Sequence, residues 1–139
     1  MDRKEQYKRK LEFIIDKITV LPDKLDDNKF FLDALFYRLQ ISIDASIDVV
    51  AMLCKDLGIT VKDDYSNLDE LEKLSIFKPG LINDLRRWNG LRNVLVHKYN
   101  KIEEEIVFQN KKRVVETLIS FTKEVEVITH EKIKFDNQN

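Results

Sequence analysis

The chain has 139 residues, enough for one domain over residues 1–139 with a core that needs no covalent staples. Its 24 Lys and Arg against 25 Asp and Glu give a formal net charge of −1, which excludes binding a polyanion through bulk charge and leaves that role to a local basic patch. One cysteine and two histidines exclude an internal disulfide and argue against a tetrahedral zinc site, so we expect no metal and no cofactor.

The first predicted helix runs from Arg3 to about residue 20. Asp2 followed by Glu5 is typical of a capping box at a helix start, and Pro22 ends the pattern. Its apolar stripe consists of Leu11, Ile14, Ile15 and Ile18.

A second and much longer helix is predicted from Lys29 to Leu57. Residues 26–28 can cap its start, and Gly58 stops it. At 1.5 Å per residue it spans roughly 45 Å, the full length of a small bundle. Its apolar residues occupy more than one face, which indicates packing on more than one partner. Among them is Cys54, which we interpret as a buried packing residue.

Two shorter helices follow. Ser66 with Asp69 three residues later predicts the start of the first, which ends before Pro79-Gly80. The second covers Leu81 to Tyr99. Gly90 lies inside it at a cost of about 1 kcal/mol relative to Ala, which suggests close approach of another backbone or a bend.

The helical pattern resumes at Ile102, with Asn110 as a predicted interruption, and residues 132–139 are expected to be a frayed tail. No segment shows the alternation of a strand. We therefore predict an all-α antiparallel bundle of four to five helices with one long central helix. The charged N-terminus and the lack of an apolar run of about 20 residues predict no signal peptide and no membrane span, hence a cytoplasmic protein.

The segment R-N-V-L-V-H-K-Y, residues 92–99, concentrates the candidate chemistry. Arg92 offers a planar, permanently charged fork that suits phosphate oxygens. His97 can exchange protons near neutral pH. Tyr99 adds a hydroxyl that can bind, donate a proton or be modified. The interleaved apolar residues can tie the segment to a core.

The simplest interpretation of this segment is a helix that shows its polar residues to solvent. The placement of these polar residues around the helix instead favours a functional site. Asn93 and His97 share one helix face, whereas Arg92 and His97 are about 140° apart on an ideal helix. Metal-free cleavage of an RNA phosphodiester needs a base, an acid and a cation, which one His97 and one Arg92 cannot all supply. Two copies that meet at a twofold axis can supply them.

With these residues in view, the sequence resembles the HEPN superfamily, and within it the HepT-like toxins of toxin–antitoxin pairs with a minimal nucleotidyltransferase. The resemblance is carried by Arg92-x4-His97-x-Tyr99 in the context W-N-G-L-R-N-V-L-V-H-K-Y-N-K-I. The segment R-L-Q-I-S-I-D-A-S-I-D-V-V before a glycine and the K-P-G break before the motif helix fit the family pattern as well.

The resemblance implies a homodimeric, metal-independent ribonuclease toxin whose site is a composite cleft at the dimer interface. Arg92 would bind the phosphate, His97 would act as general acid or base, and Asn93 would assist positioning. The partner would be a minimal nucleotidyltransferase antitoxin that adenylylates Tyr99, and the substrate an RNA, such as tRNA or mRNA. An adenylyl group would place bulk and negative charge where the substrate phosphate must lie.

Several other polar residues are candidate components of the site. Asp44 and Asp48 have the spacing of paired carboxylates, but no Glu-x-x-His motif accompanies them to make a di-metal site. One of the two could instead orient the His97 imidazole, and we choose Asp48. Cations near the motif that could contact RNA, or form only a solvated face, are Arg86, Arg87, Arg92, Lys98 and Lys101.

The remaining side chains are given structural roles. We interpret Trp88 as a core or interface residue and His130 as exposed. The competing function for the whole chain is a non-catalytic helical adaptor that binds a nucleotidyltransferase or a nucleotide, with residues 92–99 as its docking surface.

Overall fold

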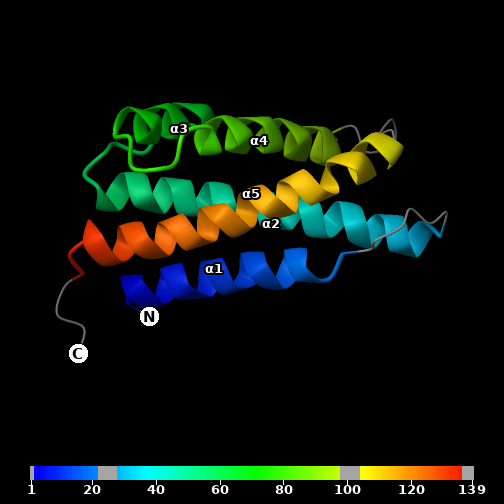
Figure 1. Cartoon of the computed structure of the whole chain (residues 1–139), viewed down its shortest axis with the longest axis horizontal. Helices are drawn as coiled ribbons and strands as arrows, with labels where there is room; N and C mark the ends of the chain where they lie inside the picture. The colour runs from blue at the N-terminus through cyan, green and yellow to red at the C-terminus, as the bar shows by residue number, and fades with distance from the viewer. Residues whose placement is uncertain (1, 22–27, 98–103, 136–139) are drawn as a thin grey trace.

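The structure is a computed structural model that describes residues 2–21, 28–97 and 104–135. These residues form α-helices and turns, with no strand among them, which confirms the predicted all-α class (Figure 1). The helices are α1 (Arg3–Thr19), α2 (Lys29–Asp56), α3 (Asp64–Lys73), α4 (Leu81–His97) and α5 (Glu104–Glu131).

The long helix α2 is the centre of the bundle, because it contacts each of the other four helices. Figure 1 shows α1 along one side of it, α3 and α4 along the other, and α5 crossing over it. Its start is capped by Asn28, whose side chain accepts a hydrogen bond from the Phe30 N–H at 2.9 Å. Gly58, with φ of +81°, allows the left-handed turn that follows its end. The predicted long central helix is therefore confirmed.

The first helix is fixed near its start by three polar contacts. Asp2 accepts a hydrogen bond from the Glu5 N–H at 2.8 Å, as the capping pattern predicted. One turn on, the Tyr7 hydroxyl donates to Asp56 of α2 at 2.5 Å, and Arg3 Nε donates to the same carboxylate oxygen at 2.8 Å. Burial raises the pKa of Tyr7 above its usual value, and the hydrogen bond to Asp56 raises it further, so this phenol stays a donor.

The helix α5 ends at Glu131, and residues 133–135 beyond it are not helical, but Ile133 and Phe135 still contact the core. Phe135 meets Tyr7 edge to face with ring centroids 6.0 Å apart, and Ile133 is also half-buried against the core. The remainder of the predicted tail, 136–139, lies outside the described residues.

Two predicted helix features are corrected. The helix α3 begins at Asp64, because Asp63 is its cap and accepts hydrogen bonds from the N–H and the hydroxyl of Ser66, both at 2.9 Å. Ser66 is thus a donor inside the first turn. Asn110 does not interrupt α5. Its side-chain amide donates to the Ile106 carbonyl at 2.9 Å and so has a hydrogen-bond acceptor within the helix.

The core confirms two residue assignments. Cys54 is fully buried, its thiol donates to the Asn67 carbonyl at 3.6 Å, and burial raises its pKa. Trp88 is buried, and its indole N–H donates to the Thr117 hydroxyl at 3.0 Å. None of the helices in the described part of the chain has the length and apolar character needed to cross a membrane.

Candidate functional site

The second half of α4 carries Arg92, Asn93 and His97 on a helix that is firmly anchored. Trp88 and Leu95 are 2% and 4% exposed, so core contacts hold the helix both before and after Arg92. The hydrogen bond from Trp88 to Thr117 ties the same helix to α5. The polar side chains therefore project from a fixed backbone, as a precise site requires.

Arg92 is held in one orientation by two acceptors. Its Nε donates to Oδ1 of Asp44 on α2, and its Nη1 donates to the Asn93 side chain at 2.8 Å. The Arg92 side chain is 28% exposed, and within the described residues its Nη2 donates to no group. A guanidinium that two acceptors orient, and that keeps one terminal NH2 group without a hydrogen bond, can donate to an incoming anion.

The carboxylate that contacts Arg92 is Asp44. Asp48, which is expected from the sequence to orient His97, makes no hydrogen bond to His97 within the described residues. Asp48 lies one turn further along α2, where it is exposed and accepts a hydrogen bond from Lys10 of α1 at 2.9 Å. The two aspartates are equivalent by sequence spacing. Only the packing of α2 decides which turn faces α4 and which turn faces α1.

His97 is the last residue of α4 and is exposed. In the described structure Arg92 and His97 make no hydrogen bond to one another, as their angular separation on the helix predicted. Tyr99, Lys98 and Lys101 lie outside the described residues. His130 is exposed, as expected, near the end of α5, at the opposite end of the molecule from the end of α4 (Figure 1).

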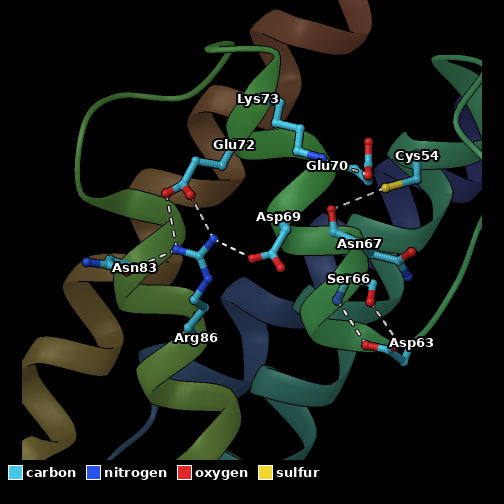
Figure 2. Close-up of polar contacts among 10 residues, drawn as sticks. All are labelled: Cys54, Asp63, Ser66, Asn67, Asp69, Glu70, Glu72, Lys73, Asn83 and Arg86. Carbon is cyan, nitrogen blue, oxygen red and sulfur yellow. Dashed lines mark hydrogen bonds and ion pairs between the residues drawn. The ribbon is translucent and has the colours of Figure 1, made fainter.

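Arg86 is not available to bind RNA, because both of its terminal nitrogens already donate hydrogen bonds. Its Nη1 donates to Glu72 at 3.1 Å and to Asn83 at 3.0 Å, and its Nη2 donates to Asp69 at 2.7 Å and to Glu72 at 2.8 Å (Figure 2). These bonds raise the pKa of Arg86, and the hydrogen bond from Arg86 holds the pKa of Glu72 below its usual value. Arg86 therefore links α4 to α3 through hydrogen bonds to Asp69 and Glu72.

Arg87 is the next cation along the helix, and it differs from Arg86. It is exposed, and its guanidinium lies over the Trp88 ring at 5.8 Å from the centroid. Its charge remains open to solvent.

The helix interior at Gly90 corrects a further expectation. A Cβ at Gly90 would meet only the Tyr65 hydroxyl oxygen, at 3.9 Å, and α4 continues through this position. Of the two expectations for Gly90, a bend or the close approach of another backbone, the second is therefore wrong among the residues that the structure describes.

Comparison with known proteins places this arrangement in a family. Residues 5–125 match the family described as Ribonuclease HepT-like. A protein of Archaeoglobus fulgidus named "Putative RNase" is 39% identical over 124 residues, which cover 89% of this chain and 93% of that relative.

Solved structures share the fold at low sequence identity. A cytosolic protein of unknown function from Bacillus subtilis, YutE, superposes with a TM-score of 0.82 at 14% identity over 94% of both chains. A tri-AMPylated HEPN toxin of Shewanella oneidensis, in complex with an MNT antitoxin, superposes with a TM-score of 0.67 at 21% identity, over 87% of this chain and 91% of that one. The family match and the close archaeal relative show that this chain belongs to the HepT-like ribonuclease family of the HEPN superfamily.

Proposed function

We propose that this protein is the ribonuclease toxin of a toxin–antitoxin pair, and that it cleaves RNA without a metal ion at Arg92 and His97. The observation that carries the proposal is Arg92 itself, which Asp44 and Asn93 orient while its Nη2 stays open. Family membership and the RNase name of the archaeal relative support the same assignment.

The chemistry requires two copies of the chain. An imidazole must take the proton of the 2′-hydroxyl, whose oxygen then attacks the neighbouring phosphorus, and an acid must protonate the leaving 5′-oxygen. The motif contains one imidazole, His97, and the other histidine of the chain is at the far end of the molecule. A twofold axis beside α4 would bring a second His97 and a second Arg92 into the same cleft. The guanidinium groups would stabilise the charge on the phosphate oxygens in the transition state.

Control of this activity would act through Tyr99. The Shewanella oneidensis toxin that shares the fold is AMPylated and bound to an MNT antitoxin. We infer that a nucleotidyltransferase partner transfers an adenylyl group from ATP to the hydroxyl of Tyr99, two residues after His97, so that the tyrosine oxygen replaces pyrophosphate on the α-phosphorus and loses its proton. The added phosphate would compete with the substrate phosphate for Arg92.

The test is cleavage of RNA by the unmodified protein in the presence of a chelator. Wild type should cleave, and His97→Ala should lose cleavage while it remains a folded dimer. In mixed dimers at equal amounts of the two proteins, a site that needs both histidines should give about a quarter of the wild-type activity, whereas independent sites should give about a half.

One outcome would replace the ribonuclease function. Intact RNA together with tight binding of the nucleotidyltransferase would indicate the adaptor function.

A separate experiment tests control through Tyr99. Co-expression with the nucleotidyltransferase should add adenylyl mass to wild type and not to Tyr99→Phe, as measured by intact-mass spectrometry. The same adduct on both proteins would exclude Tyr99 as the modified residue.

A further inference from the structure

A lysine of α1 and the arginine of the motif are held by neighbouring turns of α2. Arg92 Nε donates to Asp44, and Lys10 Nζ donates to Asp48 at 2.9 Å. The two aspartates are four residues apart, so they share one face of α2 and lie about 6 Å apart along its axis. Each cation is therefore placed by one carboxylate of the same helix face, Arg92 from the side of α4 and Lys10 from the side of α1.

This face of α2 is open to solvent. The helices α1 and α4 do not contact one another in the described structure, and α2 lies between them (Figure 1). The side chains of Lys10 and Asp48 are 41% and 59% exposed, and those of Arg92 and Asp44 are partly exposed as well. A ligand can therefore reach both cations along the strip of α2 between α1 and α4.

Lys10 keeps donors that such a ligand can use. An ammonium group carries three N–H donors, and within the described residues that of Lys10 donates only to Asp48. An exposed ion pair of this kind contributes little to stability. A phosphate can therefore bind Lys10 without breaking a contact between helices, as it can bind Arg92.

The proposed substrate needs more than one cation. A single strand of RNA is held by cations that follow its backbone, and each phosphate contact adds to the affinity and to its dependence on salt. With a formal net charge of −1, the chain must supply these cations close to the site. Arg86 is already occupied by carboxylates, whereas Lys10 is anchored one turn of α2 from the carboxylate of Arg92.

We propose that Lys10 binds a phosphate next to the one that Arg92 holds, so that the RNA strand crosses α2 from α4 to α1. The proposal rests on the ribonuclease function proposed above. It adds a residue from outside the motif helix. Because the contact is to the backbone, Lys10 would contribute to the affinity for any base sequence.

The experiment measures RNA affinity in a His97→Ala background, which removes cleavage. A short, fluorescein-labelled single-stranded RNA is titrated at several salt concentrations and its anisotropy recorded. Lys10→Met should weaken binding about fivefold at low salt and reduce the slope of log K against log salt by about 0.7, and Lys10→Arg should keep both values. The matched control is Lys73→Met, which removes the same charge from an ion pair with Glu70 on α3, a helix that does not contact α1 in the described structure.

Uncharged phosphate analogues identify the contact. The cleaved phosphate is first mapped with wild type. A methylphosphonate then replaces one phosphate at a time, in an RNA with 2′-O-methyl riboses that keep the analogue stable. Next to the cleaved phosphate it should weaken binding to the protein that retains Lys10, and it should cost nothing further in Lys10→Met. Equal penalties in both proteins at every position would overturn the proposal, and so would an unchanged affinity of Lys10→Met.

Further results separate the possible failures. If Lys10→Met dissociates the dimer in sedimentation, Lys10 is a contact between two copies of the chain and the phosphate proposal is overturned. If wild type cleaves RNA and Lys10→Met shows the same affinity and salt slope, only this inference fails. If wild type neither binds nor cleaves RNA, the proposed function fails, and the inference that rests on it is overturned as well.

Discussion

Two arginines of α4, six residues apart, have nearly equal exposure and opposite surroundings. The side chains of Arg86 and Arg92 are 24% and 28% exposed. Both terminal nitrogens of Arg86 donate two hydrogen bonds each, to acceptors on α3 and α4. Arg92 donates through Nε and Nη1 and leaves Nη2 open within the described residues. The number of occupied donors, and not the exposure, distinguishes an arginine that fastens helices from one that can bind a ligand.

The acceptors add to the contrast. Arg86 faces two carboxylates, Asp69 and Glu72, whose combined negative charge exceeds the single positive charge of the guanidinium. Arg92 faces one carboxylate, Asp44, which orients its guanidinium through Nε and leaves the Nη2 group without a hydrogen bond among the described residues. A substrate phosphate could therefore approach Arg92 without breaking a helix contact, whereas at Arg86 it would have to displace α3.

Among the substitutions that keep the charge or shape of a site residue, the largest effect is expected from Arg92→Lys. Lysine keeps the charge but cannot hold Asp44, Asn93 and a phosphate at once, because it lacks the planar fork. We expect RNA cleavage to fall about 100-fold, with little change in melting temperature. Full activity in the lysine variant would show that charge alone matters at this position.

A smaller effect is expected from Asp44→Asn. The amide can still accept a hydrogen bond from Arg92 but no longer attracts it by charge, so the guanidinium loses part of its orientation. Cleavage should fall about 10-fold. Asp48→Asn, one turn along α2, provides the comparison, since Asp48 contacts Lys10 instead. A greater loss at Asp48 than at Asp44 would restore the assignment made from the sequence.

Arg86→Met should act on stability and leave catalysis unchanged. Removing the guanidinium leaves two largely exposed carboxylates that water can solvate, so the melting temperature should fall by only about 3 °C. Calorimetry measures the shift, and the difference from wild type should shrink at high salt. A large loss of cleavage at temperatures where the variant is folded would place Arg86 in the site.

The smallest effect is the pH dependence of the same cluster. The hydrogen bond from Arg86 lowers the pKa of Glu72 below 4.5. The stability that Glu72 contributes is therefore present above this value and is lost as the pH falls through its lower pKa in the folded state. The unfolding free energy of wild type should decrease more steeply in this acidic range than that of Arg86→Met. Equal slopes would show that the ion pair contributes nothing to folding.

Local sequence signals predicted much of the fold. The caps at Asp2 and Asn28, the turn at Gly58 and the burial of Trp88 all depend on residues close in sequence or on helix periodicity, and all are confirmed. One packing contact of the fold could not be predicted from local patterns. Phe135 packs on Tyr7 from the other end of the chain, a contact that no local pattern encodes.

The candidate site likewise has features that the sequence predicts and features that depend on how the helices pack. The motif on α4 was recognised from its own spacing, and the Arg92–Asn93 contact is between neighbours. The sequence does not show which of Asp44 and Asp48 contacts Arg92, because two aspartates one turn apart are alike until α2 is packed against α4. Arg86 remained among the candidate cations for a similar reason, since Asp69 and Glu72 meet it only after α3 has docked.

The most direct measurement is the initial rate of RNA cleavage by Arg92→Met and Arg86→Met beside wild type, with melting temperatures recorded on the same samples. The same substitution on one helix separates the open arginine from the occupied one. We predict that Arg92→Met loses cleavage at temperatures where it is fully folded, while Arg86→Met keeps cleavage and melts earlier than wild type. Equal cleavage by wild type and Arg92→Met would contradict the assignment of the site.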